Sequence, residues 1–240
     1  MKVATVSDIP IRLHWSFLAL WAGFALYALS IGGLQALMMS GVVGVGLLLS
    51  VCLHELGHAM AAKRYGIDTA HITMYPFGGV AAIKDMPEEP DQELVIALAG
   101  PAVNFALVAV FGLAFAVFGS RFLVAMIGLN LVMGLFNLIP AFPMDGGRVL
   151  RALLAKRMGW VPASMLAIRI GRAFAWLFIV GGIALFHPGL VMIGAFLHFT
   201  LNAEKQRLVH MVWERKRYGN DDWSSRSPWG RAGFSRLRLR

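Results

Sequence analysis

Six apolar runs, separated by short polar segments, follow one another along the chain. The first four are each close to the roughly 20 residues that a helix needs to cross the hydrocarbon core of a membrane. The six runs are residues 13–33, 42–62, 94–118, 122–139, 173–186 and 189–201. This pattern predicts an α-helical membrane protein, a polytopic bundle of about six transmembrane helices.

The two ends of this pattern each leave an alternative. The first run resembles a secretory signal around Ala28-Leu29-Ser30, but it is longer than the apolar core of a signal peptide and is interpreted as a retained span. The last two runs, separated by His187-Pro188, are short for a full crossing, so a helical hairpin that enters the bilayer only in part stays open. We expect residues 34–41 to join the first two helices and Gly100-Pro101 to interrupt the third.

Residues 68–86 depart from the helical pattern. Within them, the run 71–83 predicts two short strands around Pro76 and Gly78-Gly79, which would form a small β-hairpin insert. Such a hairpin either packs against the bundle as a structural element or offers a free edge to which an extended peptide adds a strand. Residues 87–91 then predict a loop that ends in a helix start.

The composition supports a lipid-embedded chain. Of the 240 residues, 58% are hydrophobic and 15% are charged, whereas soluble domains carry roughly 25% charged residues. A net charge of +9 would fit nucleic-acid binding in a soluble protein, but here the basic residues lie between and after the apolar runs. If six spans alternate, all of the 22 Lys and Arg residues except Arg121 fall on one side. The sequence therefore predicts a plasma or inner cell membrane protein with both termini in the cytoplasm and no nucleic-acid partner.

The segment His54-Glu55-Leu56-Gly57-His58 lies inside the second apolar run. In a helix, His54 and His58 are one turn apart on the same face, so both imidazoles can bind one metal ion. Glu55 lies one residue further around the helix, where its carboxylate can take a proton from an attacking water and pass it to a leaving amine. Two histidines and a glutamate inside a membrane helix are costly unless they face a partner or a cavity. The motif therefore predicts a site for one Zn²⁺ ion.

Asp145 is the best candidate for the third protein ligand that a catalytic zinc site normally has. It follows the fourth apolar run in a segment, residues 140–147, whose prolines and glycines exclude a regular helix. Non-helical backbone at membrane depth occurs only where it is buried in protein or lines a cavity. The alternative is a turn residue before Gly146-Gly147, a position that Asp favours. The only cysteine, Cys52, is interpreted as a small apolar helix residue.

Three ordered motifs resemble the site-2 protease family of intramembrane metalloproteases. They are His54-Glu55-Leu56-Gly57-His58, Gly100-Pro101-Ala102-Val103-Asn104, and the run Asn137-Leu-Ile-Pro-Ala-Phe-Pro-Met-Asp145-Gly-Gly-Arg148. The resemblance extends over residues 9–201 and includes Pro10-Ile11-Arg12-Leu13-His14-Trp15 and Phe77-Gly78-Gly79-Val80.

The resemblance implies that one zinc ion is held by His54, His58 and Asp145, with Glu55 as the catalytic base. It also implies an endopeptidase that cleaves single-span membrane proteins, either in regulated intramembrane proteolysis or in the removal of leftover membrane peptides. Many members carry a PDZ insert or C-terminal CBS domains. We expect neither in these 240 residues, which indicates a compact form of the family.

Asn104 and Asn137 are polar residues inside the third and fourth apolar runs. Asn130, Gly134 and Asn137 recur at helical spacing and therefore share one face of a helix. Interhelical hydrogen bonding is the general explanation for Asn in membrane bundles. Asn137 also matches an Asn that the family has near its site. Both Asn104 and Asn137 are therefore candidates for binding the oxyanion of a tetrahedral intermediate or the backbone of the substrate.

Residues 1–212 are expected to form the transmembrane metalloprotease domain, and residues 213–240 a flexible basic cytoplasmic tail near anionic lipid. A metal transporter and an inactive membrane scaffold are the two rival functions. A transporter would place polar ligands at several depths, whereas here they concentrate at one site. A scaffold would not need Glu55. No particular substrate and no oligomeric state follow from the sequence.

Overall fold

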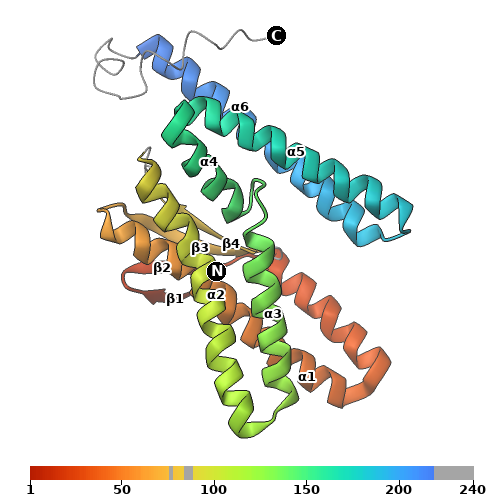
Figure 1. The fold of residues 1–240 in the computed structure, drawn as a ribbon. Coiled ribbons are helices and arrows are strands. Elements are labelled where there is room, and N and C mark those ends of the chain that lie inside the picture. The colour runs from red at the N-terminus through yellow and green to blue at the C-terminus, as the bar shows by residue number, and fades with distance from the viewer. Residues whose placement is uncertain (76–77, 84–88, 219–240) are drawn as a thin grey trace. The chain divides into compact units, whose positions relative to one another are not determined.

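The structure is a computed structural model, which describes residues 1–75, 78–83 and 89–218 (Figure 1). The described residues form four strands and six helices in the order β1, β2, α1, β3, β4, α2, α3, α4, α5 and α6. The chain divides into two compact units. One consists of Met1–Pro87 and Val95–Asn137, and the other of Glu88–Leu94 and Leu138–Arg240.

The first unit contains a four-stranded sheet in the order β1-β2-β3-β4. The strands are β1 (Lys2–Val6), β2 (Ile9–Leu13), β3 (Thr69–Tyr75) and β4 (Gly78–Ile83). The pairs β1–β2 and β3–β4 are antiparallel, while β2 and β3 run parallel. Because β4 has a sheet partner only on the β3 side within the described residues, it forms an edge of the sheet.

The two strands predicted within residues 71–83 are confirmed as β3 and β4. The strands β1 and β2 were not predicted, and residue 13, the expected start of the first helix, ends β2 instead. The reason is the shortness of β2, whose inward pair Ile9 and Ile11 gives too brief an alternation to predict a strand. These two side chains are buried against Ile72 and Met74 of β3, so the strand depends on a distant partner.

Helix α1 (Trp15–Arg64) contains the first two predicted spans. Gly33, with φ 61° and ψ −152°, breaks the helix, and the chain folds back on itself there (Figure 1). The ring of Trp21 in the first half packs against the bare Cα of Gly44 in the second half. The joint expected over residues 34–41 is wrong, because a single glycine in the left-handed region turns the chain and residues 34–41 are helical.

The helices α2 (Pro90–Phe118) and α3 (Arg121–Asn137) complete the first unit, apart from the first turn of α2. The helix start predicted within residues 87–91 is confirmed at Pro90, a residue type that favours the first helical position. The predicted interruption at Gly100-Pro101 is wrong, because α2 continues through Pro101. A proline removes one backbone hydrogen bond, and here it does not end the helix.

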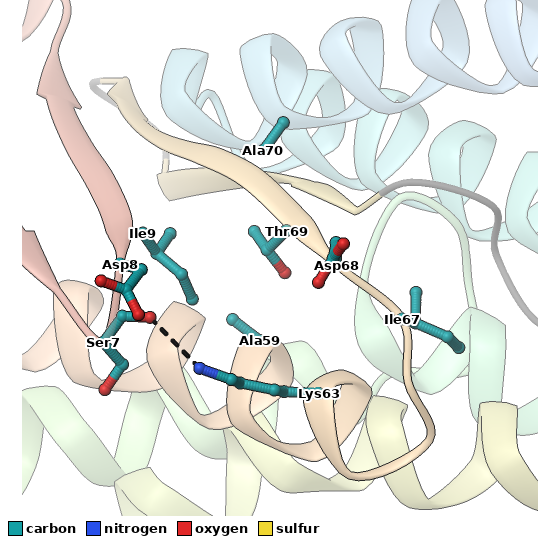
Figure 2. Close-up of a pocket in the computed structure, with 9 residues that line it drawn as sticks. All are labelled: Ser7, Asp8, Ile9, Ala59, Lys63, Ile67, Asp68, Thr69 and Ala70. Atoms are coloured by element: carbon teal, nitrogen blue, oxygen red, sulfur yellow. Dashed lines mark hydrogen bonds between the residues drawn. The ribbon is translucent and has the colours of Figure 1, made fainter.

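A cavity of about 300 Å³ lies where the β1–β2 turn meets the end of α1 (Figure 2). Ser7 and Asp8 form this turn with φ 50° and 70°, as the two-residue turns that join antiparallel strands require. Lys63 donates a long hydrogen bond of 3.5 Å to the carbonyl of Ser7 across the cavity. The hairpin is thereby held to the last turn of α1.

The second unit contains α4 (Asp145–Met158), α5 (Trp160–Ala184) and α6 (Pro188–Tyr218). Two features differ from the sequence expectation. α4 is a separate amphipathic helix, and the fifth run, expected at residues 173–186, is only the second half of α5. With 25 residues, α5 is long enough to cross a membrane, as are α1 and α2. α6 extends to Tyr218, so the first residues of the expected tail are helical, and residues 219–240 lie outside the described part.

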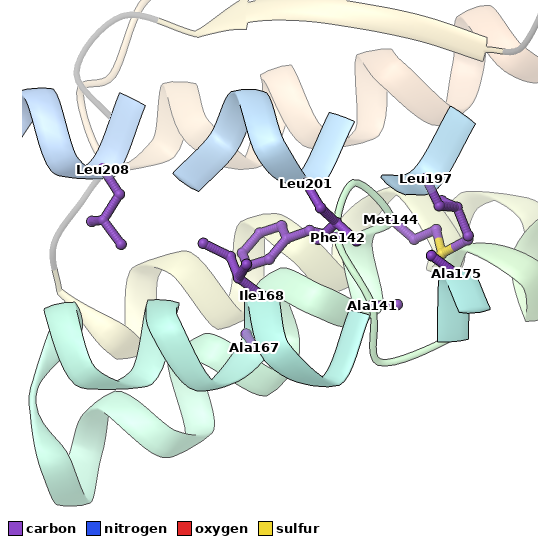
Figure 3. Close-up of a cluster of buried hydrophobic side chains, with 9 residues drawn as sticks. All are labelled: Ala141, Phe142, Met144, Ala167, Ile168, Ala175, Leu197, Leu201 and Leu208. Carbon is purple, nitrogen blue, oxygen red and sulfur yellow. The ribbon is translucent and has the colours of Figure 1, made fainter. Parts of the chain in front are cut away.

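The core of the second unit is built around the segment that follows α3 (Figure 3). Ala141, Phe142 and Met144 from this segment are buried among apolar side chains of α5 and α6. These are Ala167, Ile168, Ala175, Leu197, Leu201 and Leu208. The residues immediately before Asp145 are therefore fixed by packing, although they are not helical.

Candidate metal centre

His54 and His58 lie on one face of α1, as the helical spacing predicts. They are 4% and 3% exposed, and their Nε2 atoms are 3.2 Å apart. Two nitrogen ligands that each lie 2.0–2.1 Å from a tetrahedral zinc ion are themselves about 3.3 Å apart. The two imidazoles therefore already have the separation that a shared zinc ion requires.

The orientation of His58 is fixed by a hydrogen bond at Nδ1, the ring nitrogen that does not face His54. Its Nδ1 lies 2.7 Å from the carbonyl oxygen of Ile96 in α2, which can only accept a hydrogen bond. Nδ1 therefore carries the proton and donates, which leaves the lone pair of Nε2 available for a metal. Histidine ligands in metal sites are commonly held in this way.

Gly100 of α2 lies directly against the two imidazoles. A Cβ at this position would be 2.7 Å from Nε2 of His54 and closer still to Nε2 of His58. Gly57 of α1 makes a similar approach, since a Cβ there would be 2.9 Å from the carbonyl oxygen of Ala99. The two helices thus approach closely through glycines at the level of the histidine pair. The sequence indicated Gly100 only as a helix breaker, and its role beside the histidines was missed.

Glu55 is 9% exposed and points to a different neighbour, the edge strand β4. A Cβ at Gly79 would be 2.8 Å from both Cδ and Oε1 of Glu55, so the carboxylate lies against the bare backbone of β4. This follows from the position of Glu55 one residue around the helix from His54, since α1 also packs on β3 and β4. A carboxylate thus lies beside both the histidine pair and β4, the last strand of the sheet within the described residues.

Asp145 is the first residue of α4 in the second unit and is 8% exposed. Its position at a helix N-terminus favours the charged carboxylate. The chain turns tightly here, because a Cβ at Gly146 would collide with the carbonyls of Leu138 and Ile139. A Cβ at Gly147 would lie 2.5 Å from the backbone nitrogen of Phe142. Asp145 is therefore not an exposed turn residue but a buried acid on a tightly packed segment.

Arg151 of α4 holds this segment from within the second unit. It is 4% exposed, and its guanidinium lies 5.0 Å from the ring centroid of Phe142 and 4.9 Å from that of Trp160. Its Nε donates to the carboxylate of Glu93 at 2.8 Å, in the first turn of α2. Glu93 is 2% exposed, so this is a buried ion pair. Neither Arg151 nor Glu93 was predicted from the sequence, because no local pattern marks them as partners.

The asparagines occupy different environments in the first unit. Asn104 is fully buried in α2, while Asn137, the last residue of α3, is partly exposed. Asn130 donates from Nδ2 to Oγ of Ser50 in α1 at 3.1 Å, which is the interhelical hydrogen bond expected for this residue type. The sequence did not identify Ser50 as its partner.

Comparison with known proteins places these residues in one family. A match to peptidase family M50 covers residues 42–121 and 119–178, which include all four residues predicted for the metal centre. A zinc metalloprotease of Methanocaldococcus jannaschii is 36% identical over 214 residues, covering 86% of this chain and 60% of that protein. The protein Rip3 of Mycobacterium tuberculosis is 37% identical over 216 residues, covering 83% of this chain and 55% of Rip3. The chain thus spans little more than half the length of these two relatives.

A solved structure is also similar. The site-2 protease from Methanocaldococcus jannaschii superposes with a TM-score of 0.67 and 34% sequence identity, covering 85% of this chain and 94% of that one. Together with the apolar helices, this similarity confirms a helical, multi-pass membrane protein with a small sheet.

Proposed function

The chain belongs to peptidase family M50, and from this premise we propose that it is a zinc-dependent intramembrane endopeptidase that cleaves membrane-anchored proteins. The observation that carries the proposal is the arrangement around α1. Two buried imidazoles have the separation that one zinc ion needs, and the adjacent Glu55 faces a free sheet edge.

The metal would be held by His54, His58 and Asp145, each of which is buried and offers one ligand atom. Two imidazoles and one carboxylate form a donor set typical of catalytic zinc sites, which leave a fourth position open. A zinc ion bound there supplies Lewis acidity, which polarises a carbonyl group and acidifies water.

Glu55 is assigned the proton transfers of the reaction. As an ionised carboxylate it can accept a proton from the attacking water and later donate that proton to the amine that leaves. Its contact with Gly79 supports this assignment, because a peptide bound along β4 would lie close to the carboxylate.

The substrate would bind as an extended strand on the free edge of β4. A transmembrane helix hides its carbonyls in hydrogen bonds to residues four positions further on, so cleavage requires an unwound segment. The backbone N–H and C=O groups at the edge of a sheet can form hydrogen bonds with such an unwound segment. This favours the second of the two roles considered for the β3–β4 hairpin, an edge to which an extended peptide adds a strand, since the glycine backbone of β4 contacts the proposed base Glu55.

Asn137 and Asn104 are proposed to bind the reacting groups or the substrate backbone. Asn137 ends α3 and is partly exposed, so its amide is available to donate to a developing oxyanion. Asn104 lies one turn beyond Gly100 in α2, on the face that meets the imidazoles. From this position it acts on the site directly or through bound water.

The distribution of basic residues and the family also bear on where the protein lies in the cell and what it cleaves. We place the chain in the plasma or inner membrane with both termini in the cytoplasm, on the distribution of Lys and Arg. Residues 1–212 form the protease domain, and the basic residues 213–240 contact anionic lipid. The substrates are single-span membrane proteins, cleaved in regulated intramembrane proteolysis or as membrane remnants.

The test is cleavage of a single-span test substrate by the purified protein in lipid vesicles. We expect cleavage that a zinc chelator abolishes and added zinc restores. Glu55→Gln should abolish cleavage while one zinc per chain stays bound, because Gln keeps the size but cannot take a proton. Leu53→Met, on the exposed side of α1, is the control and should cleave normally. Full proteolysis by Glu55→Gln, or zinc movement across the vesicle without cleavage, would contradict the proposal.

A further inference from the structure

Three polar side chains from three different helices lie in the apolar part of the first unit. They are Ser50 of α1, Asn104 of α2 and Asn130 of α3, with exposed fractions of 2%, 0% and 0%. All three helices are apolar, and polar groups within such helices are costly unless they have hydrogen-bond partners. Each polar atom of these three side chains therefore needs a hydrogen-bond partner.

These side chains lie next to the histidine pair. Ser50 is one turn before His54 on the same face of α1, and Asn104 is one turn after Gly100, which contacts both imidazoles. Asn130 bonds directly to Ser50. α3 also approaches Asn104, because a Cβ at Gly134, one turn after Asn130, would be 3.4 Å from Cβ of Asn104. The three polar groups thus surround one level of the helix packing, a single turn from His54.

Their hydrogen bonds are only partly satisfied by protein. Ser50 donates to the carbonyl of Gly46 at 3.0 Å, and Nδ2 of Asn130 donates to Ser50 and to the carbonyl of Met126. Among the residues that the structure describes, Oδ1 of Asn130 and both polar atoms of the Asn104 amide have no hydrogen-bond partner. An amide group without hydrogen-bond partners in an apolar interior is destabilising, so these atoms need a further partner.

The chemistry of these groups selects the ligand. The site offers one donor atom, Nδ2 of Asn104 with its two N–H groups, and two acceptor oxygens, from Asn104 and Asn130, and no formal charge. A metal ion or an anion would lack a counter-charge, whereas water both donates and accepts and needs two to four polar partners. Neutral amides also hold water without competing with the histidines for zinc.

We propose that Ser50, Asn104 and Asn130 form a buried water-binding site that replaces the water consumed in each hydrolysis. This rests on the proposed function, because each peptide bond cleaved uses one water molecule in a centre surrounded by apolar helices. Water held one helical turn from His54 shortens the path by which the next molecule reaches Glu55.

The first test detects the water without any reference to activity. Solid-state NMR of the isotope-labelled protein in bilayers would follow magnetisation transfer from water to the side-chain amides of Asn104 and Asn130. We expect transfer several times faster than to the buried backbone amide of Met126, one turn before Asn130. Equal, slow transfer to all three would overturn the proposal.

The second test links the site to turnover. Asn104→Leu and Asn130→Leu remove the amides at similar shape, and each should lower kcat about tenfold or more while KM and bound zinc stay unchanged. Met126→Leu, which conserves volume beside Asn130, should leave kcat unchanged. If the Leu variants lose the water signal but keep full kcat, the proposed role is wrong. If the wild type shows the water signal but no cleavage, the proposed protease function fails and the water site remains.

Discussion

At the scale of single residues, the proposed centre depends on glycines, which have no side chain, as much as on polar residues. His54 and His58 meet the backbone of Gly100, and Glu55 meets the backbone of Gly79. In both places a methyl group would occupy space that the reactive side chain needs. Glycine is required here for close approach, because neither residue has a positive φ.

Asp145→Ala tests the assignment of the third ligand. Removal of a direct ligand should cost more zinc affinity than the about 10–100-fold typical for an outer partner, and cleavage should be lost with the metal. Asp145→Asn should be intermediate, since a neutral oxygen binds the ion more weakly. Elemental analysis of zinc per chain, paired with the cleavage assay, checks this. Wild-type zinc content in Asp145→Ala would mean that the third ligand lies elsewhere.

Gly100→Ala tests the close approach of α2 to the histidines. The added methyl group must displace the imidazoles or the helix, and overpacking of this kind costs about 1–3 kcal/mol. We expect reduced zinc content and reduced cleavage. Gly112→Ala, in the same helix but with nothing within 4 Å of the new methyl group, is the matched control and should keep both. Equal zinc content and equal cleavage in the two variants would contradict the close contact between Gly100 and the histidines.

At the scale of elements, α4 is the helix that the apolar pattern did not predict, and it begins with Asp145. Two ion pairs join it to the first turn of α2. Arg151 and Glu93 form a buried pair, whereas Lys156 and Asp91 form a pair that is 43% and 82% exposed. Removing one partner of a buried ion pair destabilises a protein more than removing one partner of an exposed pair. Substitutions in the two pairs should therefore lower the free energy of unfolding by very different amounts.

Arg151→Leu should destabilise the second unit by about 3–5 kcal/mol, because the carboxylate of Glu93 is left buried without its main partner. The stacking of the guanidinium on Phe142, three residues before Asp145, is lost as well. Lys156→Met should change stability by no more than about 1 kcal/mol. Thermal unfolding of the two variants in the same detergent measures the difference in their stability. Similar unfolding midpoints would show that the buried pair contributes no more to stability than the exposed pair.

At the scale of the whole molecule, the orientation in the membrane follows from charge. Because all Lys and Arg residues except Arg121 fall on one side, we expect both termini and the segment 63–91 in the cytoplasm. The test introduces single cysteines at residues 2, 68 and 240 of a Cys52→Ala variant. Labelling intact cells with a membrane-impermeant thiol reagent then shows on which side of the membrane each residue lies. Labelling of residue 240 from outside would overturn this orientation.

The basic C-terminal segment should serve membrane attachment and not catalysis. Deletion of residues 224–240 removes five of the 22 basic residues but none of the residues assigned to the metal centre. We expect cleavage of a detergent-solubilised substrate to remain nearly intact, while binding to anionic vesicles weakens and becomes less sensitive to salt. A loss of cleavage in detergent would show that this segment belongs to the folded enzyme.

The sequence alone determined the elements and chemistry that depend on neighbours in the chain. The apolar runs identified the helices, the one-turn spacing of His54 and His58 predicted that their side chains meet on one helix face, and the β3–β4 hairpin followed from a local pattern. These predictions succeeded because helix faces and hairpins are set by residues a few positions apart.

Only the tertiary structure decided which distant backbones approach the site. It showed that β4 lies against Glu55 and that α2 lies against the two imidazoles, and it paired β2 with β3 and Asn130 with Ser50. In a sequence, a glycine that permits close approach cannot be told from one that ends a helix. The sequence therefore suggested a break at Gly100, where the structure has a contact between helices. Such contacts join residues far apart in the chain, and their physical basis, the fit of one surface against another, leaves no periodic trace in either segment.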